Sequence, residues 1–467
     1  MRAWGLLGLG LAVLLLAVLF LAACERRRAP QPPPAPPPPP PAVELVAVGD
    51  ILMHQDVKRA ALESGQGPAG LWTAMEPLLR SADLAFANLE TPVAPASGQP
   101  GRPFLFNAPE DLPAALKASG FAVLSTANNH AYDQGVAGVR ETLERLAAAG
   151  LVAVGSGATR AEAERPRIVQ AHGLKVAFLG FTDLFNRNLN RGPGQPWVCP
   201  LDPDAAAAAV RAARTQADAV VVSLHWGVEY SHQPTPRQRA VAAQLAEAGA
   251  DLILGAHPHV LQPVEVIRTG DRRTVVVYSM GNFISNQDRD YRPDPGNLAD
   301  GDDRDGVAVR CRLEQERRPD GSLRVVARDP VCEPLWTVNN WAGFSAGRER
   351  RRDIRVLPVN ATLAALQTQP AAPDPPGDSL QRTLELRLER AGEVLGGAYV
   401  AGYTGPLPVP AAAPAAAAPA PAVARRRRLP RPPRPAPSAA PQPATPEVDA
   451  PPPAAGAEGE AAGGPGS

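Results

Sequence analysis

Side chains of the types that bind metal ions follow five short apolar segments of this sequence. The apolar segment before each cluster, such as residues 220–224, has the length of a buried strand. Because ligands of open α/β sheets bind beyond the carboxyl ends of strands, the sequence predicts that the clusters form one polar site. The clusters are Asp50; Asn88 and Glu90; Asn129, His130 and Asp133; His225 and Glu229; and His257 with His259.

The mixture of carboxylate, amide and imidazole groups predicts a site for one or two divalent metal ions. Imidazole suits manganese, iron and zinc, whereas carboxylate and amide oxygens favour harder ions such as manganese, so the identity of the metal stays open. Two cations held close together activate water and stabilise an oxyanion in many phosphatases and nucleases. Only seven histidines occur in the chain, and four of them lie in the clusters. Packing alone does not explain that concentration.

Each cluster has a structural explanation when it is taken alone. Asp50 follows Gly49 and could form an Asx turn, and Asn88 could cap a helix. His225 could be a core histidine with its hydrogen bonds satisfied. The most specific segment is 257–259, His-Pro-His. Alternation in an extended segment would place both imidazoles on one side.

Short apolar segments alternate with amphipathic ones between residues 43 and 278, which predicts an α/β protein with buried strands. A hairpin is expected around residues 319–321, Pro-Asp-Gly, between strands at 307–313 and 323–327. The other expected strands are 43–48, 84–87, 122–125, 176–179, 219–224, 252–254 and 275–278, and the expected helices are 71–80, 136–149, 203–215, 235–248 and 379–390.

The N-terminal segment, residues 1–24, has the features of a secretory signal. A basic start precedes an uncharged apolar run at 4–23. The ending Leu-Ala-Ala-Cys at 21–24 resembles a bacterial lipobox, in which Cys24 receives lipid and becomes the first residue of the mature chain. The alternative is an uncleaved anchor, because twenty apolar residues also suffice to span a bilayer. Both interpretations predict a membrane-attached protein whose body is extracytoplasmic.

Proline, with 55 residues, is concentrated near both ends of the chain. Residues 25–42 therefore predict a semi-rigid polyproline stalk. Residues 405–467 are rich in proline and alanine and predict a disordered tail. Four arginines at 425–428 could contact an anionic lipid or polymer, or could form a solvated linker.

The charge and cysteine content exclude some classes of protein. Lysine plus arginine and aspartate plus glutamate number 47 each, so no net charge attracts nucleic acid. Cys199, Cys311 and Cys332 do not have the spacing of a zinc site. Cys311 and Cys332 could form a disulfide across neighbouring strands, or both could remain buried thiols.

Six motifs in this order resemble the CapA-type poly-gamma-glutamate capsule biosynthesis family, which is similar to the calcineurin-like metallophosphoesterases. The resemblance covers about residues 43–338. It implies a four-layer α/β/β/α sandwich at 43–340. Independently of the resemblance, we expect an extension at 341–404 that packs on or near this domain. The motifs are Gly-Asp at 49–50, Asn-Leu-Glu-Thr at 88–91, Ala-Asn-Asn-His at 127–130, His-Trp-Gly at 225–227, Gly-Ala-His-Pro-His at 255–259 and Ser-Met-Gly-Asn-Phe at 279–283.

The resemblance also implies roles for the residues. His130 would be the general acid or an electrostatic partner beside the substrate, and Asp133, three residues later, would orient its imidazole. Asn282 would line the pocket or serve as a turn residue. The implied metal ligands are Asp50 and His259 for the first ion, Asn129, His225 and His257 for the second, and Glu90 as the bridging carboxylate.

Two positions depart from the wider superfamily. Classical metallophosphoesterases begin with Asp-x-His, but position 52 is leucine, and His54 is a candidate replacement with a different spacing. Glu90 also stands where an aspartate is usual. The capsule family shares both departures, so they indicate altered metal affinity or chemistry rather than loss of function.

Three functions are compatible with these features. The first is a metal-dependent hydrolase or transferase of the cell envelope that acts on a capsule-like polymer. The second is a non-catalytic anchor or scaffold of a polymer synthesis and export complex. The third is an exported phosphatase. Lipidation and the stalk favour the first two, and the complete set of metal-binding residues favours a functional metal site.

Overall fold

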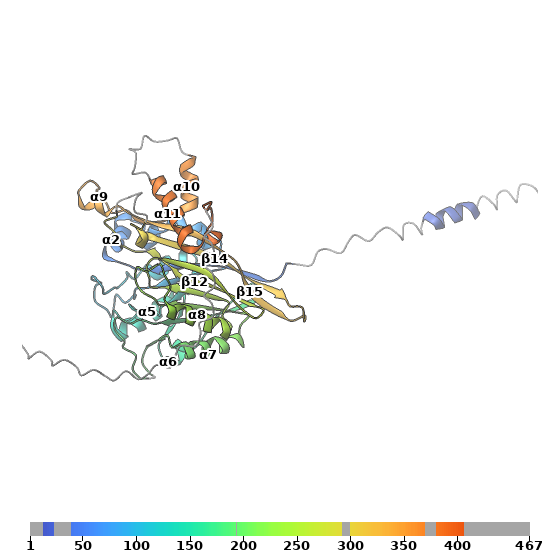
Figure 1. Ribbon diagram of the computed structural model, residues 1–467, viewed down its shortest axis with the longest axis horizontal. Helices are drawn as coiled ribbons and strands as arrows, with labels where there is room; N and C mark the ends of the chain where they lie inside the picture. Colours follow the sequence, from blue (N-terminus) through green and yellow to red (C-terminus); the bar gives the residue numbers. More distant parts are fainter. Residues whose placement is uncertain (1–12, 23–38, 193, 292–298, 369–379, 406–467) are drawn as a thin grey trace, which may run out of the picture. The chain divides into compact units, whose positions relative to one another are not determined.

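The computed structural model describes residues 13–22, 39–192, 194–291, 299–368 and 380–405 (Figure 1). Cys24, the predicted stalk as far as residue 38 and the predicted tail from residue 406 lie outside the described residues. Within the described ranges, the helices lack the combination of length and hydrophobicity that crossing a bilayer requires. The predicted boundary at residue 340 stays a prediction.

Two mixed sheets form the centre of the domain. The first has the order β16-β15-β14-β1-β2-β3-β4, with β13 beside β1, and its strands β1 to β4 are parallel. These strands are β1 (Ala42–Ile51), β2 (Leu84–Leu89), β3 (Phe121–Ser125), β4 (Val152–Val154), β13 (Asn282–Ile284), β14 (Asp305–Arg317), β15 (Leu323–Asn339) and β16 (Ile354–Pro358).

The second sheet has the order β11-β12-β10-β9-β7-β6, and its four inner strands are parallel. Antiparallel strands close both edges. A separate two-stranded sheet pairs β5 (Ser156–Gly157) with β8 (Trp197–Val198). The strands of the second sheet are β6 (Arg167–Ala171), β7 (Leu174–Thr182), β9 (Ala219–His225), β10 (Leu252–Ala256), β11 (Leu261–Thr269) and β12 (Arg272–Met280).

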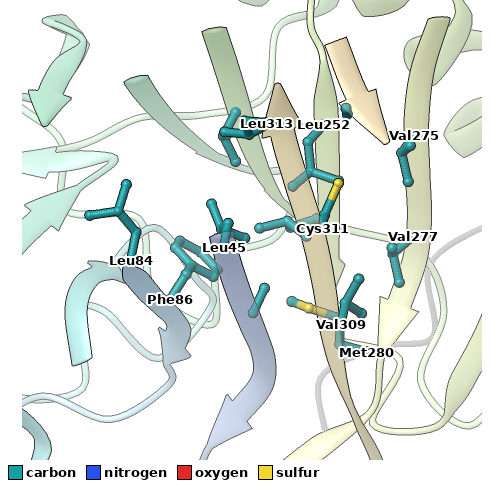
Figure 2. Close-up of a cluster of buried hydrophobic side chains, with 14 of the residues drawn as sticks. Leu45, Leu84, Phe86, Leu252, Val275, Val277, Met280, Val309, Cys311 and Leu313 are labelled. Carbon is teal, nitrogen blue, oxygen red and sulfur yellow. The ribbon is translucent and has the colours of Figure 1, made fainter. Parts of the chain in front are cut away.

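Successive side chains of a strand enter cores on opposite faces of the sheet, and this alternation produces the layers. In β1, Val43, Leu45 and Ala47 belong to a core that also contains Phe178 of the second sheet. Figure 2 shows side chains from β1, β2, β10, β12 and β14 gathered in this core. Val46 belongs instead to a core shared with the helices on the outer face of the first sheet. Because successive side chains of a strand point to opposite faces, both sheets have two covered faces.

Helices cover the outer faces. The outer face of the second sheet packs on α7 (Pro203–Arg214) and α8 (Pro236–Ala248), which contact each other (Figure 1). The outer face of the first sheet packs on α2 (Gln55–Ser64), α3 (Glu76–Arg80) and α4 (Leu112–Ala118). The predicted four-layer α/β/β/α sandwich is therefore confirmed. The remaining helices are α5 (Gly135–Ala148), α6 (Arg160–Glu164), α9 (Trp341–Ser345), α10 (Val359–Gln367), α11 (Leu380–Leu395) and the 3₁₀ turns η1 (Pro68–Leu71), η2 (Thr73–Met75), η3 (Asp302–Arg304) and η4 (Gly397–Tyr399).

The three cysteines within the described ranges, Cys199, Cys311 and Cys332, are buried thiols. Cys311 and Cys332 belong to neighbouring strands and to the same core between the sheets. Of the two alternatives, the structure therefore has the buried thiols and not the disulfide.

Candidate metal centre

Asp50 lies at the carboxyl end of β1, where the pairing register shifts against both β2 and β13. Such irregularities commonly turn a side chain toward a site. The neighbouring residue must be glycine, because a Cβ on Gly49 would lie 1.9 Å from the carbonyl oxygen of Gly281. Asp50 is fully buried, and its Oδ2 accepts a hydrogen bond from the backbone N–H of His257 at 3.2 Å.

The end of β2 supplies two more buried polar residues, Asn88 and Glu90. Asn88 Nδ2 donates to Asp50 Oδ1 at 2.7 Å and lies 3.4 Å from Glu90 Oε2. Asn128 Nδ2 donates to the carbonyl of Leu89 at 2.8 Å, so the segment after β3 fastens the end of β2. Asn88 thus holds the two carboxylates side by side and does not cap a helix.

His225 ends β9 in the second sheet and faces the residues of the first. Its Nε2 lies 3.0 Å from Asn129 Oδ1, and the same nitrogen lies 3.6 Å from Glu90 Oε1. Its side chain is 1 % exposed. The two sheets therefore join at this point through an imidazole, an amide and a carboxylate.

The residues after β10 do not form the extended segment that the sequence predicts. His257 has φ +96° and His259 has φ +60°, both left-handed conformations that are uncommon for residues other than glycine. The two rings nevertheless converge, with centroids 5.8 Å apart. Strained backbone of this kind persists at functional sites, where the surrounding contacts hold it in place.

Five of these side chains form two overlapping groups of potential ligands. One group is Glu90, His257 and His259, and the other is Asp50, Glu90 and His225. In each group the candidate ligand atoms lie within 4.8 Å of one another. Glu90 belongs to both, as expected for a bridging carboxylate. The groups divide the other residues differently from the division that the resemblance implies, so the assignment of each ligand to an ion stays a prediction.

Burial and crowding shift the pKa values of the ionisable groups. Burial, together with the charge of Asp50, raises the pKa of Glu90 well above its ordinary value. Burial and the neighbouring histidines lower the pKa of His225 well below the usual range and the pKa of His257 to about 4. Burial would also lower the pKa of His259, but Asp50, 3.2 Å from its Nδ1, outweighs burial and raises it.

The unpaired polar atoms of this cluster fit a cation. Glu90 Oε1 and His257 Nδ1 are buried and have no hydrogen-bond partner. A buried lone pair without a donor is costly, and a buried carboxylate close to a second one is more so. A divalent ion bound by these atoms would satisfy them and offset the repulsion between Asp50 and Glu90. Imidazole nitrogens combined with carboxylate oxygens suit manganese, iron or zinc.

His130 and Asp133 form a second feature beside this cluster. His130 Nδ1 lies 2.8 Å from Asp133 Oδ2, which also accepts the backbone N–H of Phe106 at 2.6 Å. The ring of Phe106 lies between His130 and His54, with centroid distances of 4.4 and 4.9 Å. His54 and Phe106 line a cavity of about 430 Å³ together with Arg102. Phe106 therefore separates this cavity from the ring of His130, which does not line it.

Three further candidates lie close to the centre but outside the two ligand groups. His54 precedes α2, and its Nδ1 accepts the backbone N–H of Asn286 at 3.3 Å. Glu229 is exposed, and its charge contributes to the raised pKa of Glu90. Asn282 is buried, and its Oδ1 accepts the Nδ1–H of His259 at 3.1 Å. Asn282 therefore contacts a candidate ligand directly.

Sequence reasoning missed residues from three loops around the site. Phe106 contacts Asp133, Asn186 contacts Asn129, and the carboxamide of Gln287 accepts a hydrogen bond from Asn282 at 2.6 Å. None of them follows a strand-like segment or belongs to a motif. These residues could have been predicted only from knowledge of which loops return to this edge of the sheets, and the sequence alone does not supply it.

Two stacked mixed sheets with buried carboxylates and imidazoles at their strand ends define an α/β protein with a candidate two-ion metal centre. The family model described as "Bacterial capsule synthesis protein PGA_cap" matches residues 44–287, more than half of the chain. This chain belongs to that family, and the expectation from the motifs is confirmed.

Individual relatives agree with this assignment. The chain is similar to "PGA biosynthesis protein CapA" of Bacillus subtilis (strain 168), with 37% identity over 51% of this chain and 62% of the relative. It is similar to "Capsule biosynthesis protein CapA" of Bacillus anthracis, with 34% identity over 52% and 60%. The chain thus matches less than two thirds of the length of these relatives. Among solved structures, a 5'-nucleotidase precursor from Thermus thermophilus has a TM-score of 0.35 and 14% identity, over 61% of this chain and 54% of that one.

Proposed function

We propose that this protein is a metal-dependent hydrolase or transferase of the cell envelope that acts on a capsule-type polymer of the poly-gamma-glutamate kind. The observation that carries the proposal is the convergence of Asp50, Glu90, His225, His257 and His259 from both sheets, with Glu90 common to two ligand groups. A scaffold without chemistry has no use for five buried polar groups of this cost. Membership of a capsule synthesis family supplies the polymer context.

The residues that would hold the ions are Asp50, Glu90, His225, His257 and His259, with Asn129 beside His225. Divalent cations bound there would supply Lewis-acid charge next to the bond that is broken. Asn88 keeps the carboxylate of Asp50 oriented through the hydrogen bond at 2.7 Å.

His130 would supply the proton for the leaving group. Its Nδ1–H donates to Asp133 Oδ2 at 2.8 Å, which fixes the tautomer and the orientation of the ring. The proton for transfer is then carried on Nε2. The backbone N–H of Phe106 holds the same carboxylate oxygen, so Asp133 cannot turn away from His130 without losing a buried hydrogen bond.

Attachment to the membrane through Cys24 belongs to the same proposal. A lipid on Cys24 and the stalk at 25–42 would keep the domain at the membrane, outside the cytoplasm, and near the machinery that makes and exports the polymer. The support is the lipobox-like ending of residues 21–24. Labelling of the wild-type chain, but not of Cys24→Ala, with a radioactive fatty acid in a bacterial host would test the attachment.

The test of the proposed function combines metal analysis with a substrate panel. We expect the purified protein to contain one to two equivalents of manganese, iron or zinc by elemental analysis, and to cleave a gamma-glutamyl oligomer or a phosphodiester. His225→Ala should lose metal and turnover, whereas His172→Ala should retain both, because the exposed His172 contacts Asp83 and no residue of the site. A protein that binds no metal would contradict the proposal.

A non-catalytic scaffold is the second candidate, favoured by Leu52. This residue is 2% exposed and lies where the classical motif places a metal-binding histidine. A scaffold would retain metal yet turn over no member of the substrate panel. In cells, His130→Ala would then leave polymer production unchanged, whereas an enzyme would lose it.

A further inference from the structure

A buried ion-pair cluster fastens helix α11 to the segment that leads into β14. Arg387 of α11 is 2% exposed. Its Nε donates to Asp305 Oδ1 at 2.9 Å, its Nη2 donates to Asp302 Oδ1 at 2.6 Å, and its Nη1 donates to the carbonyl of Asp300 at 2.9 Å. Arg390 Nη2 donates to the other carboxylate oxygen of Asp302 at 2.8 Å. One guanidinium thus holds three residues of the 300–305 segment in place.

The held segment contacts the candidate metal centre through one backbone carbonyl. Asp303, between the two anchored aspartates, accepts a hydrogen bond from Asn282 Nδ2 at 2.9 Å. Asn282 Oδ1 in turn accepts the Nδ1–H of His259 at 3.1 Å. Asp50 Oδ2 lies 3.2 Å from the same Nδ1, so two acceptors face this nitrogen. The opposite ring nitrogen, Nε2, lies 3.8 Å from Glu90 Oε1.

The same cluster contacts the loop that follows β9. His232 Nε2 donates to Asp302 Oδ2 at 2.6 Å, and its Nδ1 lies 2.7 Å from the carbonyl of Leu261, two residues after His259. Asp302 therefore joins α11, the loop after His225 and the start of β11. The family match ends at residue 287, so Arg387 and the two aspartates belong to a part of the chain that the family model does not cover.

We propose that Arg387 is a positioning residue for the metal centre: by fixing residues 302–305, it holds Asn282 in the position that orients His259 toward the cation. The inference rests on the proposed metal site and extends it to the C-terminal helix. Hydrogen-bond partners of a metal-binding imidazole fix its tautomer and ring orientation, and their loss typically lowers metal affinity 10–100-fold. Here the partner, Asn282, is itself held from a helix about a hundred residues further along the chain.

The experiment uses the full-length chain, stripped of metal and titrated with Mn²⁺ by calorimetry and with Co²⁺ by visible absorption. We expect Arg387→Met to bind Mn²⁺ about tenfold more weakly and to give an altered Co²⁺ spectrum, because His259 is no longer fixed. Arg387→Lys retains the charge and should recover part of the affinity. Glu389→Gln is the matched control, since this exposed residue of the same helix should leave both readouts at the wild-type level.

A double-mutant cycle tests whether the two residues act through one another. If Arg387 acts through Asn282, the variant that combines Arg387→Met with Asn282→Ala should bind no more weakly than Asn282→Ala alone. Fully additive losses of affinity would overturn the proposal.

The alternative is that Arg387 only stabilises the fold. In that case Arg387→Met would unfold at a lower temperature but, while folded, would bind Mn²⁺ and show the Co²⁺ spectrum as the wild type does, and the proposal would be wrong. If Arg387→Met does not fold, unchanged titrations of both Arg387→Lys and Asn282→Ala would overturn it instead. A wild-type chain that binds neither ion would contradict the proposed function rather than this inference.

Discussion

The pair formed by His130 and Asp133 can be tested separately from metal binding. Asp133→Asn keeps the size of the side chain and an oxygen for the Nδ1–H, but it removes the negative charge beside the ring and weakens the hydrogen bond that orients it. We expect kcat to fall about 10–100-fold, a part of the effect that a general acid contributes in full. Turnover of the best substrate from the panel, measured at saturating metal, provides the readout.

The metal content of the same variant is its internal control. Asp133 belongs to neither ligand group, so Asp133→Asn should retain as many equivalents of metal as the wild type. If Asp133→Asn has the kcat of the wild type, the proposal that His130 supplies the proton is wrong. Loss of metal from that variant would show that Asp133 supports the ligands instead.

Residue types and strand-end positions predict six metal ligands, and five of them form the two groups of potential ligands. They lie together because each follows a strand whose end lies at a common edge, and their binding of metal stays a prediction. The backbone at His257 and His259 could not be predicted, since only long-range contacts hold a left-handed conformation at a residue other than glycine. Phe106 and Asn186 were missed because long loops position them.

Helix α5 anchors the loop that delivers Phe106, and this anchor is pH-sensitive. Glu141 Oε2 accepts hydrogen bonds from the N–H and Oγ of Ser97, both at 2.7 Å, and Oε1 accepts from Arg145 Nε at 2.7 Å. Burial alone would raise the pKa of Glu141, but these donors outweigh it and lower the pKa from 4.5 to about 2. The stabilisation is therefore complete above pH 4.5 and is lost as the pH falls toward 2.

Glu141→Gln should consequently lower Tm by about 2 °C at pH 7, and the difference from the wild type should vanish as the pH approaches 2. Thermal unfolding followed by circular dichroism between pH 2 and 7 measures this. Glu144→Gln is the control, because Glu144 is exposed on the same helix. A Tm difference that is independent of pH would contradict a role for the Glu141 charge.

The bounds of helices and strands could be predicted where the hydrophobic periodicity was clear, and the predicted bounds were wrong where the segment contains proline. The predicted helix 71–80 is in fact a series of turns that ends in α3, because Pro77 lacks an N–H and starts a new helix at Glu76. Strand β15 continues to Asn339, well past the predicted end at residue 327, although it contains Pro330 and Pro334. Proline normally argues against a strand interior, so no local pattern favoured a longer strand.

At the scale of the whole molecule, the site depends on both sheets at once. Asp50 and Glu90 come from the first sheet, and His225, His257 and His259 come from the second. A cation bound by all five side chains therefore joins the two sheets. Without a cation, the buried carboxylates of Asp50 and Glu90 repel each other. The metal centre should therefore be coupled to global stability as well as to chemistry.

Two opposite changes in the free energy of unfolding follow from this coupling. A saturating cation at a hundred times its Kd should stabilise the wild type by about 2.7 kcal/mol. Glu90→Gln should raise the stability of the metal-free protein, since burial and the charge of Asp50 raise the pKa of Glu90 and make its carboxylate form costly. The same variant should lose most of the gain from metal, because Glu90 belongs to both ligand groups.

Urea unfolding of the wild type and of Glu90→Gln, each with EDTA and with Mn²⁺, measures the four free energies of unfolding. Glu247→Gln, an exposed position on α8, is the control and should behave as the wild type does. A Glu90→Gln protein that is less stable without metal would show that the carboxylate stabilises the fold by itself, and the cation would then not be needed to explain its burial.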